Sequence, residues 1–306
     1  MLVLVNYINI QPILTSMKHN WKITIILLTF FLIAQFIGLI LINHSIDQEK
    51  TSETGKTIFK ELPLGERPPV EERTSFIYVS LAIVLGTLFL LVLIKYNLHW
   101  IWKIWFLLAV IIALFVAWES FLTKGIALIL AIGFAAWKIF RPNFWVHNFT
   151  ELFIYGGLAL IFVPMFDLVS VIVLLILISL YDAYAVWKSK HMIKIAKSQA
   201  KAKAFAGLVI PYSFKRSKKK TKSKKLVKIK TAILGGGDIA FPLIFAGVIL
   251  KEWGFIPALI IPLGAGLGLL YLLLTGDGKK FYPAMPFISA GCFLGLLIAY
   301  LVRILL

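Results

Sequence analysis

Cysteine is almost absent from this chain: Cys292 is the only one among 306 residues. An internal disulfide is therefore impossible, and a zinc site built on four cysteines is excluded. Acidic residues are also scarce, since 14 Asp and Glu stand against 32 Lys and Arg. Charged residues of both signs make up only 15% of the chain, whereas about a quarter is usual in soluble domains. The chain is thus too poor in charge for an ordinary soluble protein.

Apolar residues take the place of the missing charge. They form 60% of the chain, and the mean hydropathy is +0.91. Apolar runs of about 20 residues are long enough to cross a bilayer, and no part outside them could bury a core of its own. The sequence therefore predicts one membrane domain, 1–306, of the all-α polytopic class. About nine spans are predicted: 22–42, 76–95, 99–118, 123–140, 149–166, 168–187, 231–250, 255–274 and 284–305.

The basic residues are gathered in one place. Sixteen of the 32 Lys and Arg lie between Lys188 and Lys230, and the loop 43–75 carries seven acidic residues. Because basic loops stay in the cytoplasm, we expect the N-terminal segment 1–21 and the loop 188–230 inside the cell. The loop 43–75 and the C-terminus are then extracellular, in a multi-pass protein of the plasma membrane. A basic loop beside a membrane is typical of contact with anionic lipid, so nucleic-acid binding is not predicted. The basic loop is expected to begin as a helix.

Two carboxylates lie well inside predicted spans, whereas the other acidic residues are near span ends or in loops. Asp182 is six residues before Lys188, the first charge of the basic loop, and Asp238 is eight residues after Lys230, the last. At about 1.5 Å per residue, the two carboxyls lie roughly 9 and 12 Å from the same membrane face, on consecutive antiparallel helices. Because a carboxylate in hydrocarbon costs at least ~2.5–3.5 kcal/mol, such residues are usually kept for function. Neighbouring carboxyls share one proton, so one can act as a base on water and the other as an acid.

Two short segments accompany these aspartates. The glycine run 235–237 comes directly before Asp238 and offers backbone that a peptide can approach closely, although tight helix packing is the ordinary use of such glycines. The segment 282–286, Tyr-Pro-Ala-Met-Pro, precedes the last span. Its prolines are expected to keep 283–286 out of the helix, although proline also simply marks helix starts.

The three features together resemble the presenilin and signal peptide peptidase family of intramembrane aspartyl proteases. That family carries Tyr-Asp on its sixth span, Gly-x-Gly-Asp on its seventh and Pro-Ala-Leu at its ninth. This chain has Tyr181-Asp182, Gly-Gly-Gly-Asp at 235–238 and Pro-Ala-Met at 283–285, in the same order and on the expected spans. Met285 departs from the usual leucine, but it has a similar volume and apolarity, so activity is expected to survive. The segment 181–193 is especially similar to archaeal presenilin homologues.

The resemblance implies a presenilin-like fold and an aspartic endopeptidase that cleaves transmembrane proteins whose N-terminus lies outside, without a cofactor. The implied catalytic pair is Asp182 and Asp238. The implied substrate-binding residues are Tyr181, Gly235, Gly236, Gly237, Pro283, Ala284 and Met285. No metal site is predicted, because the five histidines are scattered over different loops and span ends.

Two other functions compete with this interpretation. A proton- or cation-coupled transporter or channel could use the same two carboxylates. Transporters usually show two similar halves with broken helices in matching places, and this sequence shows none. A noncatalytic scaffold that binds lipid through the basic loop is the other alternative, and it leaves the two carboxylates in the spans unexplained.

Overall fold

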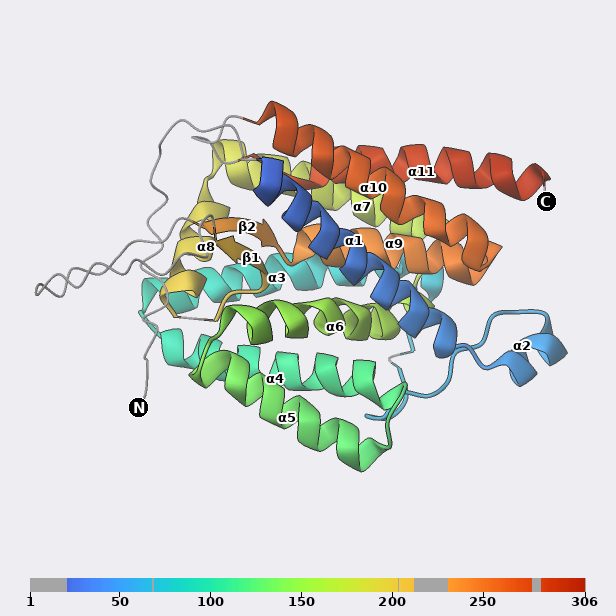
Figure 1. The fold of residues 1–306 in the computed structure, drawn as a ribbon, viewed down its shortest axis with the longest axis horizontal. Coiled ribbons are helices and arrows are strands. Elements are labelled where there is room, and N and C mark those ends of the chain that lie inside the picture. Colours follow the sequence, from blue (N-terminus) through green and yellow to red (C-terminus); the bar gives the residue numbers. More distant parts are fainter. Residues whose placement is uncertain (1–20, 68, 203, 212–230, 277–281, 306) are drawn as a thin grey trace, which may run out of the picture.

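The computed structural model describes residues 21–67, 69–202, 204–211, 231–276 and 282–305. Nine helices of 16 residues or more run through these parts of the chain, most of them side by side (Figure 1). They are α1 (Trp21–His44), α3 (Ser75–Lys95), α4 (His99–Glu119), α5 (Lys124–Phe140), α6 (Phe144–Phe162), α7 (Leu168–Ala183), α9 (Gly237–Trp253), α10 (Phe255–Thr275) and α11 (Met285–Leu305).

Shorter elements connect the long helices. Two of them are strands, which pair antiparallel with Gly207 opposite Gly235 and Val209 opposite Ile233. The strand pair and α8 lie at one end of the bundle and α2 at the other (Figure 1). The short elements are α2 (Gln48–Thr54), η1 (Glu72–Thr74), η2 (Val163–Met165), the π-helical turn η3 (Tyr184–Lys188), α8 (His191–Lys201), β1 (Gly207–Pro211) and β2 (Thr231–Gly235).

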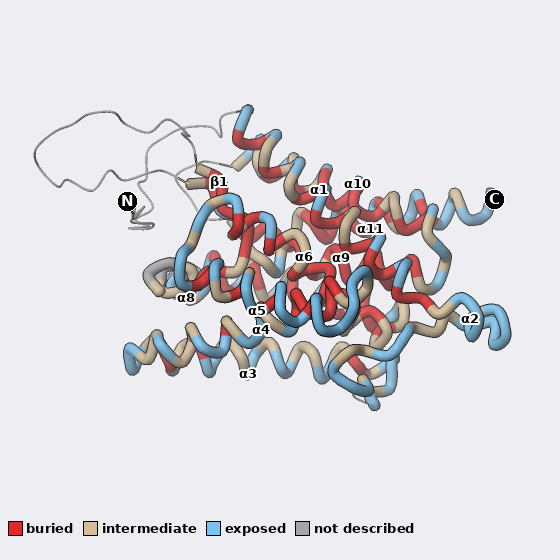
Figure 2. The backbone as a smooth tube through the Cα atoms, turned by 60° about the horizontal axis from the view of Figure 1, so that its bottom comes forward, coloured by how far each residue is buried: buried red, intermediate tan, exposed pale blue. Residues whose placement is uncertain are grey.

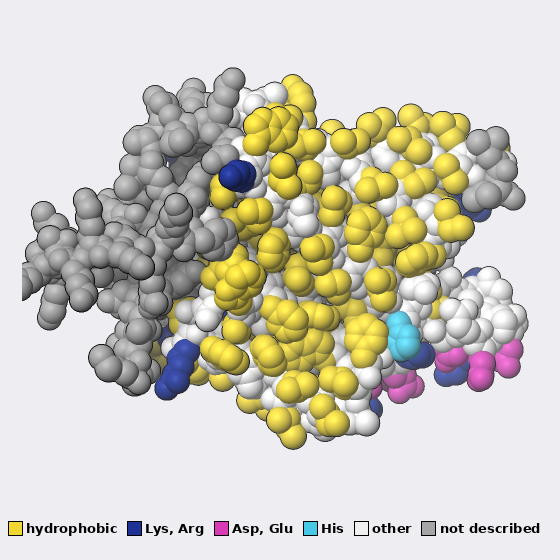
Figure 3. Space-filling view, in the orientation of Figure 1, with side chains coloured by type: hydrophobic (Ala, Val, Ile, Leu, Met, Phe, Trp, Pro, Cys, Tyr) yellow, Lys and Arg dark blue, Asp and Glu magenta, His cyan; other side chains and the backbone are white. Residues whose placement is uncertain are grey.

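The predicted polytopic helical class is confirmed. Seven of the described helices are long and apolar enough to cross a bilayer, and α5 and α9 are shorter, with 17 residues each. A helix of about 17 residues is at the lower limit for a span. Apolar side chains cover the flank of the bundle, whereas acidic side chains gather near α2 (Figure 3). This flank is what a protein solvated by lipid presents.

Helix α9 is the centre of the bundle. It packs against α1, α6, α7, α10 and α11, and all of its residues from Leu243 to Leu250 are buried. Helices α4 and α5 pack together, and α4 covers α6. Helix α3 lies at the periphery with few buried residues (Figure 2). The site residues on α9 are therefore held from several sides.

Glycines bring α10 and α11 into close contact. A Cβ on Gly264 would lie 2.3 Å from the carbonyl oxygen of Gly291, and one on Gly268 would lie 2.2 Å from that of Phe287. Only glycine fits at these positions, because the two backbones touch. Such close approach is the usual role of small residues in membrane helices. Helix α11 is thereby fixed, and with it the segment that precedes it.

Some predicted boundaries are wrong. Residues 231–235, predicted as the first turns of the seventh span, form β2, and α9 begins at Gly237. The fifth long helix starts at Phe144 rather than 149, because Asn143 caps it by accepting a hydrogen bond from Trp145 N.

The basic loop 188–230 is described only in part. The expected helix at its start is present as α8. It is not a continuation of α7, since the backbone turns at Lys190, where φ is 54°. β1 also lies within this loop and was not predicted. Residues 212–230, the most basic part, and residues 1–20 of the predicted N-terminal segment lie outside the described residues.

Candidate active site

Asp182 lies in the last turn of α7 and is buried, with 8% of its surface exposed. Its Oδ2 accepts a hydrogen bond from the backbone N–H of Met285 at 3.2 Å, so the first residue of α11 holds this carboxyl in place. One turn earlier, the Ser179 hydroxyl donates to Ser289 Oγ at 2.7 Å. These two bonds fix α7 against α11. The π-helical turn η3 begins two residues after Asp182, and such turns are frequent at functional sites.

Asp238 is the second residue of α9 and is half-buried. The expectation that it lies two helical turns deep is wrong, because the residues before it form a strand and a bend. The structure nevertheless brings Asp238 to the same end of the bundle as Asp182. Helices α7 and α9, which carry the two aspartates, pack against each other. The Asp238 side chain also lies close to the backbone of Gly235.

The glycine run surrounds the Asp238 side chain. A Cβ on Gly235 would lie 3.1 Å from Asp238 Oδ2, and one on Gly236 would lie 3.2 Å from the Tyr155 hydroxyl oxygen. Gly237 is exposed, and its Cβ would meet only the ring of Phe241, at 3.3 Å. Gly235 and Gly236 thus give room to side chains of the protein itself, whereas Gly237 leaves open space beside the carboxyl.

A polar contact from α1 holds the start of α9. Pro242 lies inside the helix and has no N–H, so the carbonyl of Asp238 has no partner four residues along. The side chain of Gln35, fully buried on α1, donates from Nε2 to the Ile239 carbonyl at 2.8 Å. This helix–helix contact is made one residue from Asp238.

The segment before α11 is less extended than predicted. Only Tyr282, Pro283 and Ala284 stay out of the helix, because α11 begins at Met285 and Pro286 is already in its first turn, where proline is tolerated. The carbonyl of Ala284 accepts from Ile288 N at 3.1 Å and is therefore not free. Pro283, Ala284 and Met285 are all buried. What this segment supplies in the described structure is the N–H of Met285 to Asp182.

Tyr181 points away from the two aspartates. Its hydroxyl donates to Thr87 on α3 at 3.2 Å and lies 2.9 Å from His191 Nε2 on α8. Burial lowers the pKa of His191 below its ordinary value, so this imidazole is neutral at pH 7. Tyr181 therefore joins α3, α7 and α8 and does not line the space between the carboxyls.

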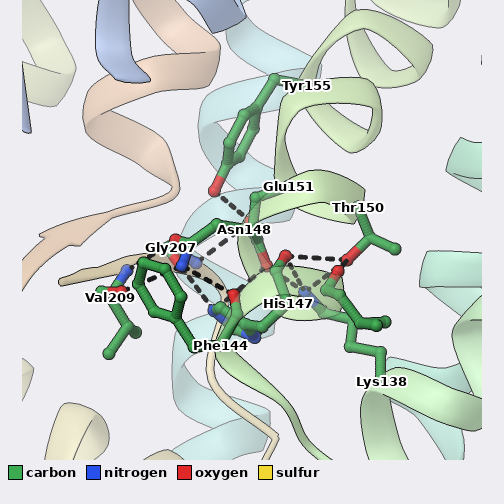
Figure 4. Close-up of polar contacts among 10 residues, drawn as sticks. Lys138, Phe144, His147, Asn148, Thr150, Glu151, Tyr155, Gly207 and Val209 are labelled. Atoms are coloured by element: carbon green, nitrogen blue, oxygen red, sulfur yellow. Dashed lines mark hydrogen bonds and ion pairs between the residues drawn. The ribbon is translucent and has the colours of Figure 1, made fainter. Parts of the chain in front are cut away.

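The outer edge of β1 is occupied by side chains of α6 (Figure 4). The amide of Asn148 pairs with Val209, donating to its carbonyl at 3.0 Å and accepting from its N–H at 3.1 Å. The N–H of Gly207 donates to Glu151 at 3.2 Å, and its carbonyl is 2.8 Å from His147 Nε2. Because the carbonyl can only accept, this nitrogen is the donor.

The opposite edge of the strand pair, on β2, has no strand beside it among the described residues. In an antiparallel pair, a residue whose N–H and C=O point away from the partner strand lies opposite a residue whose own N–H and C=O also point away. Gly207 and Val209 point outward to α6, so their partners Gly235 and Ile233 also point outward, on the β2 side. This open edge runs toward Asp238, since β2 ends at Gly235 and a Cβ on Gly235 would lie 3.1 Å from Asp238 Oδ2.

A buried ion pair lies behind the strands and was not anticipated. Lys138 Nζ and Glu151 Oε1 are 2.6 Å apart, and both side chains are 1% exposed. The sequence signal that could have indicated this pair was the opposite charge of Lys138 and Glu151, which lie on α5 and α6, two helices joined by a short loop. β1 had a signal too, since residues 208–210, Leu-Val-Ile, are a β-prone run in a basic loop.

These features define a polytopic helical membrane protein in which two aspartates, on the packed helices α7 and α9, lie at the end of the bundle that carries a small strand pair. Comparison with models of protein families matches residues 28–304 to the family described as signal-peptide peptidase, presenilin aspartyl protease. The chain belongs to this family and is therefore an intramembrane aspartic protease, a hydrolase. The resemblance seen in the sequence motifs is confirmed.

Solved structures give the same fold. Two crystal forms of a presenilin family intramembrane aspartate protease match with TM-scores of 0.59 and 0.57. The first is 19% identical and covers 92% of this chain and 99% of its own; the second is 20% identical and covers 90% and 96%. A search of curated proteins gives no match.

Proposed function

We propose that the protein hydrolyses peptide bonds inside transmembrane helices, with Asp182 and Asp238 as the catalytic pair. The observation that carries this proposal is the position of the two aspartates, at the C-terminal end of α7 and the N-terminal end of α9, two helices that pack against each other. Family membership favours this function over the transporter alternative. Two neighbouring carboxyls cannot both ionise easily, so they share one proton.

The shared proton allows both halves of the reaction. The ionised carboxyl takes a proton from a water molecule, and the water oxygen bonds to the carbonyl carbon of the peptide. The protonated carboxyl donates to the carbonyl oxygen at the same time. As the C–N bond breaks, a proton passes to the leaving amine. The N–H of Met285 restrains one of the two carboxyls during these steps.

The substrate backbone is proposed to add as a strand to the open edge of β2. A transmembrane helix must unwind before water can reach its peptide bond, which leaves N–H and C=O groups in need of partners. The outward-pointing groups of Ile233 offer such partners. A strand laid along this edge leads to Asp238, past the open space at Gly237. Pro283 and Ala284, buried next to Asp182, are proposed to close the site on the other side.

The charge distribution supports an orientation. The end with the strand pair, α8 and the basic loop is proposed to face the cytoplasm, together with the N-terminus. The end with α2 and the C-terminus is then extracellular, in the plasma membrane. A substrate strand antiparallel to β2 would enter with its N-terminus outside.

The catalytic roles are tested by Asp182→Asn and Asp238→Asn. Asparagine keeps the shape of each side chain but cannot carry the proton, so each single variant is expected to lose cleavage by at least about a hundredfold with the fold intact. Asp167→Asn is the matched control, because Asp167 caps α7 at its far end by accepting from Ser170 N, and asparagine caps equally well. Retained cleavage by either site variant would remove that aspartate from the mechanism.

A further inference from the structure

The ion pair of Lys138 and Glu151 lies next to β1, because Glu151 also accepts a hydrogen bond from the backbone N–H of Gly207. A charge pair buried in a membrane protein is costly, and it is tolerated only when all of its donors and acceptors have partners. Lys138 Nζ also reaches Thr150 Oγ1 at 3.1 Å and the carbonyl of His147 at 3.3 Å. Glu151 uses its second oxygen for the hydroxyl of Tyr155 and for the N–H of Gly207 (Figure 4).

Glu151 thereby contacts both strands, directly or through Tyr155, at the end of the pair that lies next to Asp238. It bonds the first residue of β1 directly, at Gly207. It also orients Tyr155, whose hydroxyl packs against Gly236, the residue after β2. A residue with a side chain does not fit at position 207, since φ is 143° and a Cβ would lie 2.3 Å from the Leu234 carbonyl oxygen.

We propose that Glu151, held in place by Lys138, is a positioning residue that fixes the register and rigidity of the β1–β2 pair beside Asp238. The inference rests on the proposed function, because the strand pair is the surface to which the substrate strand is proposed to bind. Asn148 assists by pairing with Val209, two residues further along the same edge. With β1 fixed along its outer edge, β2 has one position relative to Asp238, so the added substrate strand has one scissile bond.

Two double variants separate the effect of the ion pair from the effect of the contact to Gly207. Lys138→Met with Glu151→Gln removes both charges but keeps an oxygen for the Gly207 N–H. Lys138→Met with Glu151→Leu removes both charges and that oxygen. Replacing both partners of a buried pair avoids leaving a lone charge, so both variants are expected to fold. Any difference between them reports on the contacts of this oxygen to Gly207 of β1 and to Tyr155, which packs against Gly236.

The measurements combine activity with hydrogen exchange. The probe is a synthetic single-span peptide with a glycine pair in its inner half, cleaved in mixed lipid micelles, with products identified by mass spectrometry. The glutamine variant should keep the wild-type cleavage position and rate. The leucine variant should have kcat lower by about tenfold or more, since small misplacements are costly, with KM changed less and products spread over neighbouring bonds. Amide exchange across 207–211 should rise only in the leucine variant.

A stability control excludes a merely structural effect. Leu160→Ala removes buried volume at the other end of α6 without touching the strands, so it should lower Tm but leave the cleavage position unchanged. If the leucine variant does not fold, Asn148→Leu serves instead, because it has similar volume and loses both bonds to Val209.

The outcomes distinguish this inference from the proposed function. Identical cleavage positions and kcat in the two double variants, or equal amide exchange, would overturn the positioning role of Glu151 and leave the protease function standing. If the wild-type protein cleaves no probe while Asp182 and Asp238 are intact, the proposed function fails, and the catalytic part of this inference falls with it.

Discussion

The two aspartates depend on backbone groups from different parts of the chain. Asp182 is bonded by Met285, which is 103 residues away, whereas the Asp238 side chain lies against Gly235, three residues before it. Asp238 is therefore held locally, and Asp182 depends on how α11 packs. The residues that provide these groups are better targets for substitution than the aspartates, since their changes separate positioning from chemistry.

Replacing Gly237 with leucine tests the open space beside Asp238. A leucine there is expected to abolish cleavage because it fills the path of the substrate. Thermal stability should change little, since its Cβ meets only the Phe241 ring at 3.3 Å and helix propensity improves by about 1 kcal/mol. Gly133→Leu on α5, where a Cβ has nothing within 4 Å, is the matched control and should cleave normally. Wild-type cleavage by Gly237→Leu would return this glycine to a packing role.

Replacing Met285 tests the hydrogen bond to Asp182. Met285→Pro removes the N–H at a position where proline fits, the first residue of a helix. A hydrogen bond to a charged group contributes about 1.5–3 kcal/mol, so cleavage should fall roughly ten- to a hundredfold. Met285→Leu keeps the N–H, restores the residue usual in the family and should remain active. Equal rates in the two variants, measured on one peptide substrate, would show that the bond is dispensable.

At the scale of elements, the strand pair is the part that distinguishes this protein from a simple bundle. Its outer edge on β1 is satisfied by α6, and its other edge, on β2, ends beside Asp238. The strands were missed because three β-prone residues, 208–210, between a glycine and a proline are a weak signal in a basic loop. Pairing across residues 207 and 235 is a long-range contact that no local pattern specifies.

Two substitutions of Ile233 distinguish a substrate that pairs with the backbone of β2 from one that contacts only its side chains. Its N–H points away from β1, so Ile233→Pro should leave the strand pair intact, as proline does on the outward side of an edge strand. If the substrate pairs there, this variant should raise KM severalfold or lose cleavage. Ile233→Ala keeps the N–H and loses only the partly exposed side chain, so it should retain most activity. Equal losses in both variants would indicate side-chain contact rather than backbone pairing.

At the scale of the whole molecule, charge is strongly unequal between the two ends. The acidic residues of the loop 43–75 lie at the end with α2, and the basic loop 188–230 joins the end with α8. The loop 43–75 also carries five basic residues, and Lys251 at the same end pairs with Glu72 at 2.6 Å. The loop 188–230 carries 16 basic residues and no acidic one, so most of the net charge of +18 lies in this loop.

The basic face should bind anionic lipid. Each basic residue near such a surface contributes about 1 kcal/mol, and the contribution falls as salt screens it. A peptide that spans 188–230 is expected to bind phosphatidylserine vesicles more tightly than neutral ones at low salt, with the difference lost at high salt. The same peptide with its lysines replaced by glutamine is the control. Indistinguishable binding to the two kinds of vesicle would rule the lipid contact out.

The sequence by itself determined the class of the protein and its two central residues. Long apolar runs can only be helices in lipid, because every backbone group must be paired within the segment. Asp182 and Asp238 stood out because carboxylates are costly in such runs. The glycine and proline motifs beside them completed a family pattern that the comparison confirmed.

Only the tertiary structure decided how these residues are held. Lys138 and Glu151 are ordinary charges in the sequence, and they become a buried pair because α5 and α6 fold against each other. The bond from Met285 to Asp182 requires α11 to lie against α7. Such contacts depend on which helices pack together, and hydropathy depends only on composition within each helix. The sequence therefore defined what must enter the membrane, and packing decided which polar groups meet there.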